Sequence, residues 1–351
     1  MQTRNNRMRG LDIHGALSSN EQESDHNQTR LIYITSLGHS GSTLVDMSLG
    51  TIPSVFSTGE LRYLPWQLYR EKYAEELSEQ AQNICTCGKR FSTCAIWRPV
   101  VDSLSHEYGY DIMEEPFRFR IDFLGSQRYA GNVSLAKSIL RKCVNHGMSS
   151  PFSKIVGVIA KAVSDKIVLR NWELISKVSQ VTGSDWVVDS TKDPLRLFHL
   201  ACHFPRRVRV LVLFRSLRGY IASAMKRGSE PDKEICEWFR FYSRINKLIG
   251  RMQSWTWAFL NYEDFCRQPS VELARISRTF GITMTNHNGN KRYIDTSQYH
   301  MVAGNKMRYG GKIEIRVDDS WRNILTRNEL DKIEDVLATQ GHPLKEYICA
   351  R

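Results

Sequence analysis

The sequence predicts an α/β fold: a three-layer sandwich with a central parallel sheet and a mostly helical insert. Apolar segments of strand length begin at Leu31, Trp186, Val208 and Trp257, and helical segments follow them. Strands that alternate with helices in this way form parallel sheets through right-handed crossovers. The run from Val208 to Phe214 is apolar except for one arginine, as expected of a strand that is covered on both faces.

The first expected strand, Leu31 to Ile34, runs into a turn of small residues and then into a helix that resumes apolar periodicity at Leu44. Glycines allow a tight turn, hydroxyl groups donate hydrogen bonds, and a helix start offers unpaired N–H groups and a positive dipole end. This order of residue types predicts a loop that binds a phosphate or a similar anion. The loop consists of Gly38, His39, Ser40, Gly41, Ser42 and Thr43.

The loop does not match one that binds ATP or GTP. The Walker A pattern is Gly, four residues, then Gly-Lys-[Ser/Thr], and its lysine contacts the β- and γ-phosphates. Ser36 stands at the first glycine position and Ser42 at the lysine position, and His39 is the nearby basic residue.

Two later strands are followed by basic residues. Arg215 comes directly after the strand Val208 to Phe214, at the edge where open α/β sheets bind ligands, and Ser223 lies eight residues further on, in the next expected helix. Lys192 follows the strand before it, just ahead of Pro194, which is placed to open a helix. A helix dipole mildly disfavours a lysine at that position, which suits a site where an anion is expected.

These segments together resemble the sulfotransferases that use 3′-phosphoadenosine 5′-phosphosulfate (PAPS), in particular bacterial-type members related to carbohydrate and protein-tyrosine sulfotransferases. The resemblance implies a P-loop-like fold and in-line transfer of a sulfuryl group from PAPS to a hydroxyl or amine, with PAP as product and no metal required. It implies that the loop binds the 5′-phosphosulfate, that Arg215 and Ser223 bind the 3′-phosphate, and that Lys192 approaches the sulfuryl group.

Two residues of the resemblance have alternative interpretations. Glu60, in the segment Phe56 to Leu61, matches a glutamate that acts as general base in related enzymes, and it equally suits a carboxylate at the start of a helix. His39 stands where related enzymes usually have Lys or Arg. Its ordinary pKa near 6.5 leaves it partly charged, and bound anions would raise that pKa. Alternatively, His39 is the base and Glu60 orients it.

The segment from His300 to Arg308, followed by Trp321, resembles the late loop that closes over the nucleotide in these enzymes. Its Lys306 and Arg308 are therefore candidate phosphate ligands, although its composition equally describes a mobile basic surface loop. The segment Asn261 to Phe265 resembles a Tyr-Glu-Asp segment whose role is mainly structural.

The chain of 351 residues has a formal charge of +12, which suits an anionic nucleotide. Its basic residues are spread along the chain, so no nucleic-acid partner is expected, and no apolar run of eighteen residues suggests a membrane span. Residues 1–30 read as a disordered tail without an apolar signal core, which favours a cytoplasmic location.

Residues 31–351 are expected to form the enzyme domain, with the insert at about 82–184. Helices are expected at Leu61–Leu77, Leu135–Val144, Asn171–Val181, Leu195–Cys202, Leu217–Lys226, Lys233–Leu248 and Arg327–Thr339.

The insert opens with Cys85, Cys87 and Cys94, the densest group among eight cysteines. They could bind zinc together with His106 or another ligand, form a disulfide, or pack the insert as reduced thiols. The usual zinc knuckle needs two cysteine pairs, and a cytoplasmic location disfavours a disulfide.

Two other function classes are compatible with parts of this pattern. A nucleotide or small-molecule kinase would share the fold, but the Walker lysine is missing. A non-catalytic nucleotide- or polyanion-binding protein would keep the loop and Arg215 without needing Glu60 or Lys192. The acceptor of a transferase would be a carbohydrate, a lipid or other small hydroxyl compound, or a peptide tyrosine; the sequence fixes neither the acceptor nor the oligomeric state.

Overall fold

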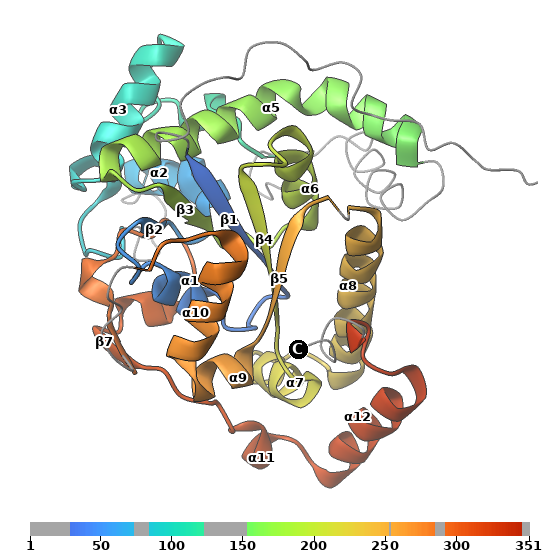
Figure 1. The fold of residues 1–351 in the computed structure, drawn as a ribbon. Coiled ribbons are helices and arrows are strands. Elements are labelled where there is room, and N and C mark those ends of the chain that lie inside the picture. Colours follow the sequence, from blue (N-terminus) through green and yellow to red (C-terminus); the bar gives the residue numbers. More distant parts are fainter. Residues whose placement is uncertain (1–28, 74–83, 123–152, 253, 285–291, 346–351) are drawn as a thin grey trace, which may run out of the picture.

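The central sheet is parallel, as the sequence predicts. The structure is a computed structural model that describes residues 29–73, 84–122, 153–252, 254–284 and 292–345. In these ranges five strands pair in the order β2-β3-β1-β4-β5, and every neighbouring pair is parallel (Figure 1). The strands are β1 (Arg30–Thr35), β2 (Val55–Ser57), β3 (Trp186–Asp189), β4 (Val208–Phe214) and β5 (Thr256–Asn261).

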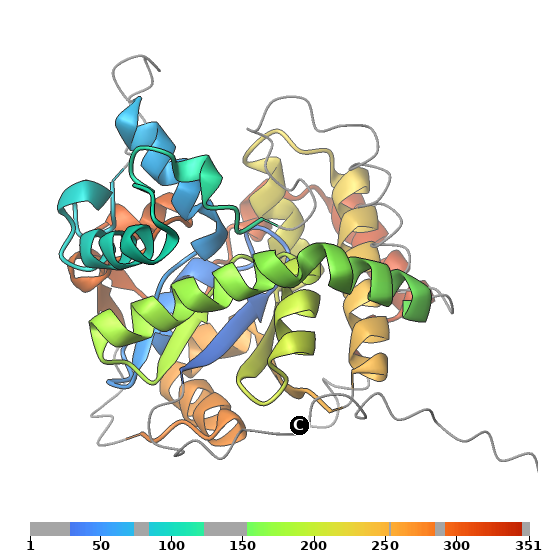
Figure 2. The same cartoon turned by 90° about the horizontal axis from the view of Figure 1, so that it is seen from above.

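Helices cover both faces of the sheet. Successive side chains of each strand point to opposite faces, and in these strands both faces are apolar. Leu31 and Tyr33 of β1 belong to one buried apolar cluster, and Ile32 and Ile34 belong to the other. The first cluster is completed mainly by α3 (Trp97–Tyr108), α5 (Ser153–Thr182), α6 (Pro194–His203), α7 (Leu217–Met225) and α8 (Pro231–Arg251). The second is completed by α1 (Ser42–Leu49), α9 (Tyr262–Arg267) and α10 (Pro269–Phe280) (Figures 1 and 2). The predicted three-layer α/β class is therefore confirmed.

The expected helices Leu195–Cys202, Leu217–Lys226, Lys233–Leu248 and Arg327–Thr339 each match a helix of the structure within a few residues. The helices of the described ranges are α1 (Ser42–Leu49), α2 (Leu64–Lys72), α3 (Trp97–Tyr108), α5 (Ser153–Thr182), α6 (Pro194–His203), α7 (Leu217–Met225), α8 (Pro231–Arg251), α9 (Tyr262–Arg267), α10 (Pro269–Phe280), α11 (Trp321–Ile324) and α12 (Arg327–Gln340). Pro194 opens α6 at its first position, as predicted. The expected segment Asn171–Val181 is the C-terminal part of α5, which is 30 residues long.

The remaining differences are few. The segment Val55–Ser57 is an edge strand that the sequence analysis did not predict, because three residues are too short to show a period. The expected helix from Leu61 begins with a 3₁₀ turn, η1 (Leu61–Tyr63), before α2. The expected tail, the end of the helix towards Leu77 and the expected helix Leu135–Val144 lie outside the described residues.

The C-terminal part carries a small hairpin of β6 (Tyr293–Asp295) and β7 (Lys312–Glu314), paired antiparallel. Between these two strands the chain runs back to the main sheet, where Ala303 forms a parallel bridge with Gly59. The residues His300–Arg308, called the late segment below, therefore lie against the carboxyl end of β2.

Candidate active site

The candidate site lies where all five strands of the described sheet end. Each carboxyl end leads into a segment with a polar or basic residue, and in a parallel sheet these ends share one edge. The order along the sheet is Glu60 after β2, Lys192 after β3, the loop of residues 38–43 after β1, Arg215 after β4 and Tyr262 after β5.

The loop after β1 has the tight geometry that its glycines predict. Gly41 precedes α1 with φ of +91°, and a Cβ atom built on it would overlap the ring of Tyr262. Only glycine fits both the backbone conformation and this close approach. Tyr262 therefore forms a wall behind the start of α1, a role that the sequence analysis did not assign to it.

Lys192 joins the loop to Glu60. Its Nζ donates to Glu60 Oε1 at 2.6 Å and to Ser42 Oγ at 3.3 Å, and both charged side chains are 17% exposed. The lysine thus reaches the loop position that a Walker lysine would occupy, but from the neighbouring strand. The structure brings these three predicted residues together.

Two predicted cationic residues share an unusual backbone conformation. Among the described residues other than glycine, positive φ angles occur at His39 (66°) and Lys192 (71°). Such left-handed conformations cost energy in residues with a Cβ atom and concentrate at functional sites. Their occurrence at these two positions supports the choice of both residues.

Glu60 does not act as a helix cap. It stands at the N-cap position of η1, but its side chain makes no capping hydrogen bond there and instead accepts from Lys192. Of the two interpretations of Glu60, the contact with Lys192 therefore favours a role in the site.

A buried ion pair fixes the segments on both sides of this contact. Asp189, at the end of β3, accepts from Arg196 Nε at 2.9 Å, and both side chains are almost fully buried. The same carboxylate accepts from the backbone N–H groups of Thr191 and Leu61, which adjoin Lys192 and Glu60. The positions of Glu60 and Lys192 are therefore set by one buried network.

Arg215 is 5% exposed and lies beside the loop. Its Nη1 donates to the carbonyl of His39 at 3.3 Å, and its Nη2 pairs with Asp318 at 2.9 Å. The guanidinium stacks on the ring of Tyr262, and its Nε has no hydrogen-bond partner among the described residues. The arginine thus places a buried positive charge beside the loop, as expected of an anion ligand.

The electrostatics of His39 differ from the expectation of a cation. Partial burial, together with the positive charges of Arg227 and Lys192, lowers the pKa of His39 below its ordinary 6.5. This shift favours the neutral imidazole, and a bound anion has to raise the pKa of His39 before it can act as a cation.

The other predicted phosphate ligands have different surroundings. Ser223, on α7, is half-buried and accepts from Arg227 at 3.5 Å. Lys306 is exposed, directly after Asn305, whose backbone N–H donates to Thr43 Oγ1 at 3.0 Å. Arg308 is buried and donates to the Met301 carbonyl at 2.8 Å, so its side chain supports the late segment. Its phosphate contact stays a prediction, as do those of Ser223 and Lys306.

The late segment contacts both halves of the site. Val302 N–H donates to the Thr58 carbonyl at 2.8 Å, and Glu60 N–H donates to the Ala303 carbonyl at 3.1 Å. Together with the contact of Asn305 to Thr43, these bonds place the segment across Glu60 and the start of α1.

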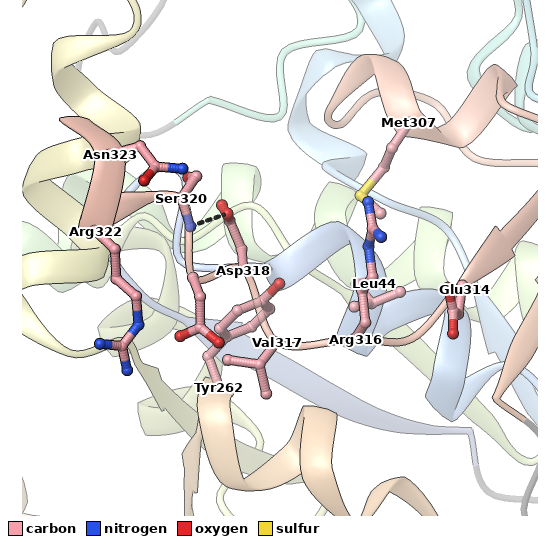
Figure 3. Close-up of a pocket in the computed structure, with 11 residues that line it drawn as sticks. Leu44, Tyr262, Met307, Glu314, Arg316, Val317, Asp318, Ser320, Arg322 and Asn323 are labelled. Carbon is pink, nitrogen blue, oxygen red and sulfur yellow. Dashed lines mark hydrogen bonds between the residues drawn. The ribbon is translucent and has the colours of Figure 1, made fainter.

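A cavity of about 580 Å³ borders the partners of Arg215 (Figure 3). Tyr262 and Asp318 form part of its wall, with Leu44 and Met307 on the side nearest α1. Asp318 is held in place by the backbone N–H of Ser320, which donates to it at 3.1 Å. The volume is in the range of small-molecule sites.

The three cysteines of the insert converge as well. Cys85, Cys87 and Cys94 lie together with His300 of the late segment, and their ligand atoms are all within 4.8 Å of one another. The expected partner His106 is not in this group. It lies near the C-terminal end of α3, about 14 Å along the helix from the end that adjoins Cys94.

No protein-family model matches the sequence, and no curated protein is significantly similar to it. Solved structures do match. The sulfotransferase domain of a Synechococcus olefin synthase is 16% identical, with a TM-score of 0.43 over 91% of this chain and 98% of that chain. The sulfotransferase domain of the curacin biosynthetic pathway is 14% identical, with a TM-score of 0.43 over 89% and 98%. Sulfotransferase STF1 of Mycobacterium tuberculosis is 13% identical, with a TM-score of 0.36 over 74% and 69%.

All three are sulfotransferases or sulfotransferase domains. Within the described ranges, no helix has the length and apolar content needed to cross a membrane.

Proposed function

We propose that this protein is a sulfotransferase that moves a sulfuryl group from PAPS to a hydroxyl or amine of a carbohydrate, a lipid or other small molecule, or a peptide. The observation that carries the proposal is the position of Lys192, which bridges the carboxylate of Glu60 and the hydroxyl of Ser42 in the anion loop. A base, a cation and an anion cradle in direct contact are the parts that group transfer to a hydroxyl requires.

The donor is assigned from the loop and Arg215. The loop amides of residues 40–43, at the start of α1, suit the 5′-phosphosulfate, and Lys192 suits the oxygens that gain negative charge as the sulfur–oxygen bond to PAP breaks. Arg215, whose guanidinium lies beside the loop, suits the 3′-phosphate, as does Ser223 on α7. The cavity beside Tyr262 offers space for the rest of the nucleotide.

The transfer itself needs few protein groups. The acceptor oxygen attacks the sulfur in line with the leaving phosphate, through a loose transition state in which positioning and charge stabilisation dominate. Glu60 takes the proton from the acceptor, and Lys192 stabilises the charge on the leaving side. His39 becomes a second cation once a bound anion raises its pKa.

The test is transfer of labelled sulfuryl from PAPS across a panel of carbohydrate, lipid and peptide acceptors. We expect transfer by the wild type and a large loss of transfer in Lys192→Met. The matched control, Lys233→Met, changes an exposed lysine on α8 and should keep the wild-type rate. Transfer of a phosphoryl group from ATP with Mg²⁺, without transfer of a sulfuryl group from PAPS, would make the protein a kinase. PAP binding without transfer to any acceptor in a broad panel would make it a nucleotide-binding protein.

A further inference from the structure

The group of Cys85, Cys87, Cys94 and His300 has the dimensions of a tetrahedral metal site. Cys94 Sγ lies 3.7 Å from Cys85 Sγ and 3.9 Å from Cys87 Sγ. His300 Nδ1 lies 3.7 Å from Cys85 Sγ and 3.1 Å from Cys94 Sγ. Zinc bonds of about 2.3 Å to sulfur and about 2.0 Å to nitrogen give tetrahedron edges of about 3.8 Å and about 3.5 Å. These four separations lie close to those edges, and all four ligand atoms lie within 4.8 Å of one another.

The backbone around the group presents the ligands inward. Gly88, with φ of +80°, closes a turn in which Cys85 N–H donates to Lys89 and Gly88 N–H donates to Cys85. Cys94 precedes the N-terminal end of α3, whose dipole favours a thiolate. On the other side, Trp97 Nε1 donates to the His300 carbonyl at 2.7 Å. Local turns and helix ends therefore hold all four ligands.

We propose that Cys85, Cys87, Cys94 and His300 bind one zinc ion, which joins the insert to the late segment. Three thiolates and one imidazole in a closed tetrahedron are the ligand set of a structural zinc site. A disulfide would use two of the cysteines, and it would need their sulfurs about 2.05 Å apart rather than 3.7 Å or more. Simple core packing gives no reason for four polar ligand atoms to face one point.

The consequence of such a site follows from the next residues of the chain. His300 is followed by Val302 and Ala303, which exchange backbone hydrogen bonds with Thr58 and Glu60. The ion would therefore hold the segment that braces Glu60, although it lies outside the reaction itself. The metal site does not depend on the proposed transferase activity.

Metal content of the full-length protein tests the site. The protein is expressed with added zinc, purified without a metal-binding tag and measured by mass spectrometry. We expect about one zinc per chain, retained in Cys236→Ser, whose cysteine is exposed on α8, and lost in Cys87→Ser and His300→Ala. Zinc-free wild type, or equal loss in Cys236→Ser, would overturn the proposal. So would a Cys85–Cys94 disulfide in metal-free protein.

Cobalt substitution keeps the test decisive if the ligand variants fail to fold. Wild-type protein loaded with Co²⁺ should show sulfur-to-metal charge-transfer bands and the strong visible bands of a tetrahedral ion; their absence would overturn the proposal. Hydrogen exchange tests the joining role: zinc removal should speed exchange at the Val302 and Glu60 amides but not at Val210 in central strand β4. Unchanged exchange at the first two amides would refute that role.

Discussion

Replacing Glu60 with glutamine separates catalysis from binding in this site. The glutamine oxygen can still accept from Lys192 Nζ, which lies 2.6 Å from the carboxylate, so the local structure should persist. The proton acceptor is lost, and a general base contributes about 10²- to 10⁴-fold, or about 3 to 5 kcal/mol of activation free energy. We expect kcat to fall by that factor. The dissociation constant of PAP should not rise, because the change removes a negative charge beside an anion site.

The assay is steady-state sulfuryl transfer against pH, with calorimetric binding of PAP, for wild type, Glu60→Gln and His39→Arg. Because the pKa of His39 in the free protein is lowered, a His39 base would lose kcat/KM only as the pH falls below 6.5. If the acidic limb disappears only in His39→Arg, and Glu60→Gln keeps its activity, then Glu60 is not the base. His39 would be the base instead. A matching rise of the PAP dissociation constant in Glu60→Gln would show a role in binding instead.

Three further predictions test other parts of the protein. Gly41→Ala should lower the free energy of unfolding in a denaturant titration by about 1–3 kcal/mol, because its Cβ would overlap Tyr262 at a positive φ. The control Gly38→Ala has open space around its Cβ and should leave the free energy of unfolding unchanged. Asp318→Asn should tighten PAP binding about fivefold in calorimetry, because it frees the Arg215 guanidinium from a partly exposed ion pair. Weaker binding would mean that Asp318 positions Arg215 for the ligand. Burial raises the pKa of Asp46 to about 7, so the folded state binds the extra proton and wild-type stability should fall as the pH rises from about 4 to about 7. Asp46→Asn should remove this slope from thermal melts, and an unchanged slope would show that another group causes it.

Much of the arrangement of the candidate residues was predictable, because parallel strands place their carboxyl ends on one edge. Lys192 and Arg215 could be chosen from their positions after apolar runs, and the loop from its glycines and hydroxyls. The pairing of Lys192 with Glu60 follows from the adjacency of β2 and β3, which no local pattern reveals, since β2 has three residues.

The parts that were missed depend on contacts between distant segments. His300 joins cysteines more than 200 residues earlier, and the nearer His106 was a reasonable choice only while the direction of α3 was unknown. Tyr262 read as structural, but its ring lies against both Gly41 and Arg215 because β5 is the neighbour of β4. Such roles become visible only when the sheet order is known.

The most direct test of the proposed donor is the affinity of the wild-type protein for PAP compared with ADP, by titration calorimetry at one ionic strength. PAP and ADP contain the same adenosine and the same number of phosphates. PAP has one phosphate on the 5′ position and one on the 3′ position, whereas ADP has both on the 5′ position. A charge-assisted contact to Arg215 predicts PAP binding about ten- to a hundredfold tighter than ADP, with the preference lost in Arg215→Met. Equal or tighter binding of ADP would contradict the assignment of PAPS as donor.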